Sequence, residues 1–276
     1  MPSAKRTIST HFLHDPKKAH MNINEKGSRY GISGTSDLIL HENDFRRARK
    51  VYQTESEIVL DGSNELTDRG VFQGTAYVLI SSVQKYQGQV DGFDAFLDWM
   101  SARRVGKNAS ASELSRTFKK SSVNFYRQKA YYIARLANEW GDLDILERIQ
   151  ENIGTSREHE VALRKSLVAD IKGLGDKTAS LLLRMCGAEH VVPIDSLMLE
   201  WLYFHGYPCE MHYSKAYRKD LKSNGKVSVR QRKRDIKRRQ YLQVEEFALD
   251  LSKKYSVPGY LLQLAVWAKR STYSKM

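Results

Sequence analysis

Apolar side chains recur every three to four residues along most of the chain beyond residue 41, and no long segment alternates apolar with polar residues. The first pattern is typical of amphipathic or buried helices, whereas alternation would indicate half-buried strands. Gly141, Gly187 and Gly206 each follow such a segment, at the kind of place where a helix commonly ends. The sequence therefore predicts an all-α fold class, and only residues 54–61 have the composition of a short strand or a linker.

The periodic segments give the expected order of elements. We expect helices over residues 42–52, 71–83, 93–99, 112–118, 125–140, 143–153, 158–171, 176–186, 196–205, 241–255 and 260–270. Residues 1–40 are polar and aperiodic, which indicates an arm or irregular lead-in. We divide the chain into an N-terminal arm with the first helix (1–60), a helical core with a basic insertion at 207–240 (61–240), and C-terminal helices that complete a second subdomain (241–276).

The charge of the chain favours a polyanionic partner. The 276 residues carry a formal net charge of +13, and the pI is about 9.6. Much of the excess lies between residues 215 and 239, where Asp220 and Asp235 are the only acidic residues among many lysines and arginines. We expect Arg230 and Arg234 in this stretch to contact phosphate, although a solvated surface or a targeting signal has the same composition.

Cysteine usage limits the possible cofactors. Cys186 and Cys209 are the only cysteines, which argues for a reduced compartment without a disulfide framework and excludes a cluster held by four thiolates. His205, Cys209 and His212 have a spacing compatible with zinc but lack an obvious fourth ligand, so we expect no metal and no cofactor. The sequence shows neither a signal peptide nor an apolar run of about 20 residues that could cross a bilayer. We expect a cytoplasmic or nucleoid protein, or a nuclear one in a eukaryote.

The strongest local motif is Ile-Lys-Gly-Leu-Gly-Asp-Lys at residues 171–177, between two expected helices. Gly173 and Gly175 permit a tight hairpin with positive φ angles. Because neither has a side chain, backbone N–H groups at the start of the next helix stay uncovered and can bind a DNA phosphate. Lys172 and Leu174 complete the hairpin, and Leu174 should pack between the helices. Such contacts hold a duplex without reading its sequence, and the same glycines also suit a plain turn between helices.

Lys177 lies in the first turn of the helix after the hairpin. The helix dipole disfavours a positive charge there, and the neighbouring Ala179, Leu182 and Leu183 should belong to a buried face. Both effects favour the uncharged amine that a nucleophilic lysine needs. The ordinary alternative is a surface lysine whose alkyl stem covers apolar neighbours.

Asp195 stands at the end of the sequence Val-Val-Pro-Ile-Asp, directly before the helix expected at 196–205. An aspartate in this place commonly caps the helix through its side chain. A capping carboxylate can still face a cleft, where it stabilises a developing oxocarbenium charge or assists proton transfer. We expect the starts of the two helices to meet, so that Lys177 and Asp195 reach one nucleotide.

The hairpin, Lys177, a buried helix and the Val-Pro-Ile-Asp sequence before the next helix together resemble the helix-hairpin-helix DNA glycosylases. The likeness is specific over residues 171–205 and fainter over 70–140 and 241–276. It implies two helical subdomains with the active site in the cleft between them. It also implies that Lys177 forms a Schiff base with C1′ of the damaged nucleotide, that Asp195 is the catalytic aspartate, and that the enzyme is bifunctional, a glycosylase with β-lyase activity.

Within this superfamily the chain looks most like the compact archaeal-type 8-oxoguanine DNA glycosylase/AP lyases. Residues 125–130 are similar to a basic helix start of that group, which implies DNA contacts by Arg127 and Lys129. Trp267 matches a tryptophan on the last helix of that group. The group ends in a lysine that helps to recognise the base, whereas this chain ends in Met276. The resemblance thus implies base recognition near Trp267 and Met276.

Gln84 lies in the turn after the helix expected at 71–83, where it could fill the space left by a flipped base. The expected partner is double-stranded DNA containing a damaged base, 8-oxoguanine above all, or an abasic site, bound by a monomer without membrane association. Two alternatives stay open. One keeps the chemistry but removes a modified pyrimidine, and the other is a non-catalytic DNA-binding module in which Lys177 packs and Asp195 only caps.

Overall fold

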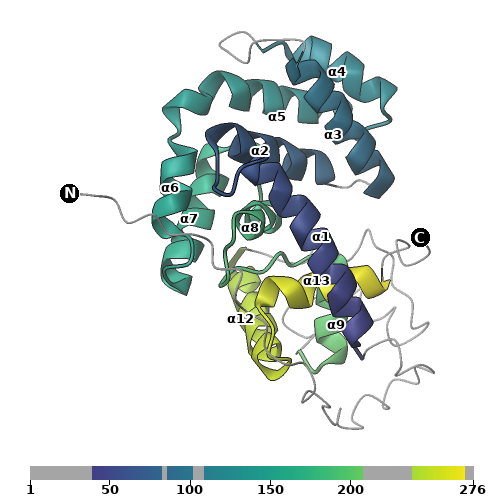
Figure 1. Ribbon diagram of the computed structural model, residues 1–276, viewed down its shortest axis with the longest axis vertical. Helices are drawn as coiled ribbons and strands as arrows, with labels where there is room; N and C mark the ends of the chain where they lie inside the picture. Colours follow the sequence, from purple (N-terminus) through teal and green to yellow (C-terminus); the bar gives the residue numbers. More distant parts are fainter. Residues whose placement is uncertain (1–38, 83–85, 102–108, 208–237, 271–276) are drawn as a thin grey trace. The chain divides into compact units, whose positions relative to one another are not determined.

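The computed structural model describes residues 39–82, 86–101, 109–207 and 238–270. All regular secondary structure in these ranges is helical (Figure 1), which confirms the predicted fold class. None of the helices in these ranges is long and apolar enough to span a membrane. The described residues divide into two compact units, one that includes Gln53–Val191 and another that includes residues 39–52, 192–207 and 238–270.

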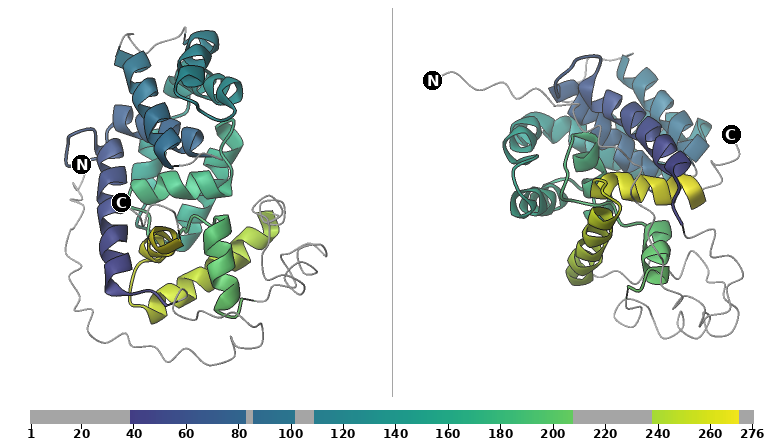
Figure 2. Two further views of the ribbon diagram at one scale, coloured as in Figure 1. Left: turned by 90° about the vertical axis from the view of Figure 1, so that its right-hand side faces the viewer. Right: turned by 60° about the horizontal axis from the view of Figure 1, so that its bottom comes forward.

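The first unit is a group of helices around one apolar core. It contains α2 (Asp68–Ser81), α3 (Tyr86–Ser101), α4 (Ala111–Lys120), α5 (Tyr126–Glu139), the short 3₁₀ helix η4 (Trp140–Asp142), α6 (Ile145–Asn152), α7 (Arg157–Asp170) and α8 (Asp176–Met185). Helices α4 and α5 pack side by side, α2 contacts α3, α5 and α8, and α7 packs on α8 (Figure 2). The core of this unit runs from Val59 to Val191 in sequence.

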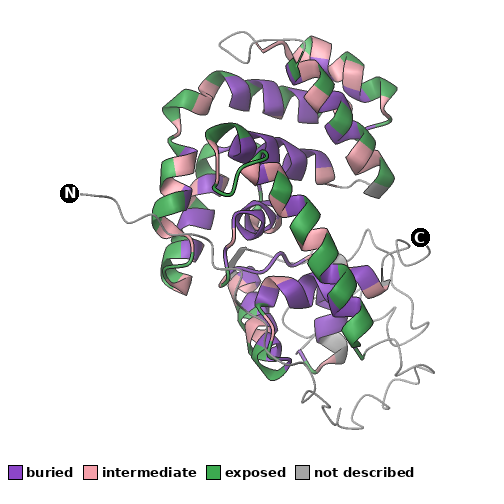
Figure 3. Ribbon diagram, in the orientation of Figure 1, coloured by how far each residue is buried: buried purple, intermediate pink, exposed green. Residues whose placement is uncertain are grey.

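Helix α8 lies deep in the first unit. Every residue from Thr178 to Met185 is buried, and the helix is drawn almost wholly in the colour of buried residues (Figure 3). The expectation that Ala179, Leu182 and Leu183 belong to a buried face is confirmed, since all three have no exposed surface. The second residue of α8, Lys177, is only half-buried. The first two residues of α8 are therefore partly accessible, whereas the rest of the helix is fixed by packing in the core.

The second unit has its own core. It contains α9 (Ser196–Phe204), α12 (Arg238–Lys254) and α13 (Gly259–Arg270), which pack on one another, and the N-terminal part of α1 (Glu42–Leu60). Trp201 and Leu262 are fully buried in this core, and Phe45 and Ala48 of α1 belong to it as well. The chain enters this unit through the buried segment Val192–Ile194, which leads to Asp195.

The prediction for residues 54–61 is wrong, because α1 continues without a break to Leu60. Ile58 and Val59 suggest a strand by composition, but Glu55 and Val59 lie four residues apart on one helical face and are both buried. Glu55 also forms a buried ion pair with Arg184. Local β propensity is weak, and tertiary packing overrides it here.

Candidate active site

The hairpin at residues 171–177 joins α7 to α8 through a tight turn. The amide of Leu174 donates a hydrogen bond to the carbonyl of Ile171 at 3.2 Å. Gly173 stands at the third position of this turn with φ +100°, a value that favours glycine. Ile171 and Leu174 are both buried, so two apolar side chains anchor the turn to the core of the first unit. This confirms the expected burial of Leu174, while Lys172 between them is exposed.

The ring of Tyr132, on α5, packs closely against Gly173 of the turn. A Cβ atom at Gly173 would lie 2.3 Å from the Cδ2 atom of the Tyr132 ring. Such an approach is shorter than real Cβ contacts, and Cγ of the same ring would lie 2.8 Å away, so the ring would have to shift. Gly173 is therefore required twice, by its φ angle and by the close approach of the ring.

Gly175 differs from Gly173. The expectation of a positive φ is wrong at this residue, whose φ of −125° is extended and open to any residue. No atom lies within 4 Å of where its Cβ would be, so nothing within the described part of the chain explains the glycine. Gly175 is the N-cap of α8 and has no side chain to bond the first-turn amides of Asp176 and Lys177. Those N–H groups are left for an outside acceptor.

Lys177 is the second residue of α8. Within the part of the chain that the structure describes, its amine makes no hydrogen bond and no ion pair. Asp176 beside it is already engaged, because its Oδ1 lies 3.8 Å from Nε of Arg164. Lys177 is a half-buried residue on the first turn of a buried helix, and its amine has no counter-charge among the described residues, which fits the nucleophile that the sequence predicts.

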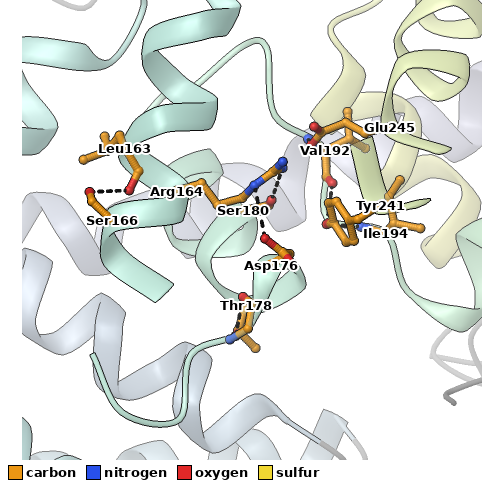
Figure 4. Close-up of polar contacts among 11 residues, drawn as sticks. Leu163, Arg164, Ser166, Asp176, Thr178, Ser180, Val192, Ile194, Tyr241 and Glu245 are labelled. Carbon is orange, nitrogen blue, oxygen red and sulfur yellow. Dashed lines mark hydrogen bonds and ion pairs between the residues drawn. The ribbon is translucent and has the colours of Figure 1, made fainter. Parts of the chain in front are cut away.

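Arg164 of α7 fixes the start of α8 (Figure 4). Its side chain is 1% exposed, and its Nη1 donates a hydrogen bond to Oγ of Ser180 at 3.0 Å. Through Asp176 and Ser180 the guanidinium holds two points of the first turns of α8, on either side of Lys177. A buried guanidinium needs such partners to offset its desolvation.

Asp195 is the N-cap of α9, as its place in the sequence predicts. Its Oδ1 accepts a hydrogen bond from the amide of Met198 at 2.8 Å, and its carbonyl accepts one from the amide of Leu199 at 2.9 Å. The side chain is half-buried. Its second oxygen, Oδ2, accepts no hydrogen bond from the residues with described positions. The cap thus occupies one carboxylate oxygen and leaves the other without a hydrogen bond among the described residues.

The residues predicted to bind DNA do not behave alike. Arg127 is exposed, and its guanidinium carbon lies 5.7 Å from the ring centre of Tyr126. Lys129 departs from the prediction, since it is 3% exposed and its Nζ donates a hydrogen bond to the carbonyl of Ile80 at 2.6 Å. Burial lowers the pKa of Lys129 to about 8. Lys129 fixes the C-terminal end of α2 and is not available to a phosphate.

Trp267 is half-buried on α13 of the second unit. Gln84, Arg230, Arg234 and Met276 lie outside the described residues, as do Cys209 and His212.

His205 has a structural setting in the second unit. Its ring stacks on Trp201 with centres 3.7 Å apart, and Nδ1 lies 2.8 Å from the carbonyl of the same residue. Burial lowers the pKa of the imidazole. In the described ranges no three His, Cys, Asp or Glu side chains gather as they would around a metal ion.

Phe125 is a feature that the sequence did not single out on its own. It is the N-cap of α5, with φ +56°, and 61% of the residue is exposed. A large apolar side chain in left-handed backbone is costly in both respects, and such residues cluster at functional sites. Arg127 follows two residues later and is also exposed, so this part of the first unit has an exposed aromatic and an exposed cation close together in sequence.

Comparisons with known proteins agree with these features. The family model of 8-oxoguanine DNA glycosylase matches residues 98–223, which contain the hairpin, Lys177 and Asp195. The 8-oxoguanine DNA glycosylase/AP lyase of Methanocaldococcus jannaschii is 30% identical over 160 residues. This alignment covers 58% of the chain and 63% of that relative, so it spans less than two thirds of the relative's length.

Solved structures share the fold. The crystal structure of the 8-oxoguanine DNA glycosylase of Methanocaldococcus jannaschii gives a TM-score of 0.60 at 20% identity, over 83% of this chain and 92% of that one. The same organism's glycosylase/lyase in complex with a 15mer DNA containing 8-oxoguanine gives 0.58 at 21% identity, over 80% and 90%. The 8-oxoguanine DNA glycosylase of Thermotoga maritima gives 0.58 at 17% identity, over 82% and 92%. These likenesses establish the fold.

Proposed function

We propose that this chain, whose residues 98–223 match the family model of 8-oxoguanine DNA glycosylase, belongs to that family and is a DNA glycosylase with AP lyase activity that removes 8-oxoguanine from double-stranded DNA. The observation that carries the proposal is the setting of Lys177, a half-buried residue in the first turn of a buried helix whose amine has no partner among the described residues.

In the proposed reaction the damaged nucleotide leaves the base stack, so that its C1′ can meet the enzyme. Once its amine has lost a proton to solvent, Lys177 bonds to C1′ while the bond from C1′ to the base breaks, and the base leaves with the electron pair and takes up a proton. Opening of the sugar ring gives a Schiff base. Loss of a proton from C2′ and of the 3′ phosphate then cleaves the strand by β-elimination.

Asp195 has a complementary part in this proposal. Its free Oδ2 would lie near the sugar and stabilise the positive charge that develops as the base departs. The cap to Met198 keeps the carboxylate in one orientation, and such preorganised charge is what transition-state stabilisation requires.

Gly175 supports the proposal that the hairpin binds DNA phosphate. The space beside its Cα is empty, and the first-turn amides of α8 have no side-chain cap. A phosphate oxygen that accepts from these amides would also gain from the dipole of α8. The exposed Lys172 stands in the same turn and supplies a positive charge.

Borohydride trapping tests the proposed function. The protein is incubated with a duplex that contains one 8-oxoguanine, and borohydride then reduces any Schiff base to a stable adduct. We expect an adduct with the wild type and none with Lys177→Gln. Lys165→Gln, which makes the same change on the exposed face of α7, is the matched control and should leave the adduct intact.

The substrate alternatives are decided in the same assay. Duplexes with a modified pyrimidine replace the 8-oxoguanine duplex, and base release is compared under single-turnover conditions. Faster release of the pyrimidine would assign the enzyme to that substrate. No adduct with any lesion, including an abasic site, would reduce the chain to a DNA-binding module.

A further inference from the structure

Two side chains of α12 hold the backbone that leads to Asp195. The Tyr241 hydroxyl accepts a hydrogen bond from the amide of Ile194 at 2.9 Å and donates one to the carbonyl of Val192 at 2.8 Å. Oε1 of Glu245 accepts from the amide of Val192 at 2.8 Å. Figure 4 shows both side chains directed from α12 at this segment.

These contacts lie in a dry environment. Tyr241 is 4% exposed and Glu245 is fully buried, as is Val192, while Ile194 is 3% exposed. A buried backbone group without a partner is costly, so three hydrogen bonds of this kind fix the path of the segment.

Pro193 explains why side chains perform this task. Its ring removes one N–H from the segment and fixes one φ angle, so the segment cannot pair along its whole length with a neighbouring strand. The Tyr241 hydroxyl bridges the proline by bonding backbone groups on both sides of it. Tyr241 and Glu245 are four residues apart and therefore project from the same face of α12.

Asp195 follows Ile194 directly. Its carboxylate is fixed on one side by the cap to Met198 and on the other by the backbone that Tyr241 holds. We propose that Tyr241 is a positioning residue for Asp195, with Glu245 supporting the same segment. This inference rests on the proposed function, since it assigns to Tyr241 an effect on base release through Asp195.

Tyr241→Phe removes only the hydroxyl that bridges Val192 and Ile194. Displacements of the order of 1 Å at a catalytic group can lower a rate by about a hundredfold. We expect single-turnover release of 8-oxoguanine, scored by alkaline strand cleavage, to slow by about tenfold or more. The Kd for a duplex with a stable abasic-site analogue should stay within about twofold, because the hairpin that we propose to bind phosphate is unchanged.

A double variant separates positioning from general damage. If Tyr241 acts only through Asp195, then Tyr241→Phe should slow the wild type but add little to the loss already caused by Asp195→Asn. A merely structural role predicts that the two losses multiply. Multiplying losses would overturn the inference, as would an unchanged release rate for Tyr241→Phe.

Tyr77→Phe is the matched control. The Tyr77 hydroxyl is also buried and lies 3.3 Å from Oε1 of Glu55, but in the first unit and away from Asp195 in sequence. It should leave base release unchanged, and an equal loss in both variants would overturn the inference. If Tyr241→Phe unfolds below the assay temperature, Glu245→Met, which removes the acceptor of the Val192 amide, takes its place with the same expectations for rate and double variant.

The failure of this inference can be told from the failure of the proposed function. A wild type that releases no base contradicts the function itself. If the wild type releases 8-oxoguanine and Tyr241→Phe releases it at the same rate, only the role of Tyr241 is contradicted.

Discussion

Substitutions of the two hairpin glycines test the site sharply, because the fold requires a glycine at residue 173 but not at residue 175. In Gly173→Ala an L residue must adopt φ +100°, at about 1–2 kcal/mol. Its Cβ would also meet the Tyr132 ring at 2.3 Å, and overpacking of this kind adds about 1–3 kcal/mol. We expect Gly173→Ala to lower the free energy of unfolding by about 2–5 kcal/mol.

Gly175→Ala should leave stability almost unchanged. The φ of −125° suits alanine and nothing lies within 4 Å of the new methyl group. The lower entropy of the unfolded chain raises the free energy of unfolding by about 0.4–1 kcal/mol, and the poorer N-cap lowers it by a similar amount. The methyl group would stand where we propose a phosphate approaches, so DNA affinity should fall about tenfold, or about 1.4 kcal/mol.

Denaturant unfolding measures the stabilities, and fluorescence anisotropy with an abasic-analogue duplex measures the affinities. Gly141→Ala is the control, because nothing lies within 4 Å of its Cβ position either and it is far from the hairpin in sequence. A stable Gly175→Ala protein with wild-type affinity would refute the phosphate contact at this residue. A Gly173→Ala protein of wild-type stability would refute the account of the turn.

Three further predictions follow from buried and exposed groups. Arg164→Leu should destabilise the protein by about 3–5 kcal/mol in denaturant unfolding, since it leaves Asp176 and Ser180 without their buried partner. Arg135→Ala, at the exposed pair with Glu139, should change the free energy of unfolding little. Equal losses of stability in the two variants would contradict the role given to Arg164. Burial lowers the pKa of Lys129 to about 8, so the unfolded state binds more protons than the folded state between about pH 8 and 10. The free energy of unfolding should therefore rise by about 2–3 kcal/mol over this range. Lys129→Met should lack this rise, and parallel plots of stability against pH for the two proteins would refute the lowered pKa of Lys129. Phe125→Ala should weaken binding to a duplex with little loss of stability, whereas Tyr131→Ala, which removes another exposed aromatic of the same region, should not; equal affinities of the two variants would deny Phe125 a DNA contact.

Local patterns predicted the elements that local physics controls. The helical period located nearly all helices, and the glycine and apolar residues of the hairpin predicted its turn and the burial of Leu174. The position of Asp195 before an apolar helix predicted its cap. These features depend on residues within one or two turns of one another, so a single sequence contains them.

The misjudged features depend on contacts between distant segments. Lys129 stands in a basic stretch, but its partner is the carbonyl of Ile80, forty-nine residues away. Arg164 and Tyr132 are ordinary helical residues in sequence, and only packing brings them to the hairpin. Tyr241 and Ile194 share a hydrogen bond although they are 47 residues apart in sequence. No local period or motif signals such pairs.

The central claim is that Lys177 is the nucleophile. The most direct measurement is mass spectrometry of the borohydride-trapped complex after digestion of both protein and DNA. We expect one modified peptide, with the sugar remnant on Lys177. A remnant on another lysine, such as Lys172 in the same hairpin, or no remnant on any peptide would contradict it.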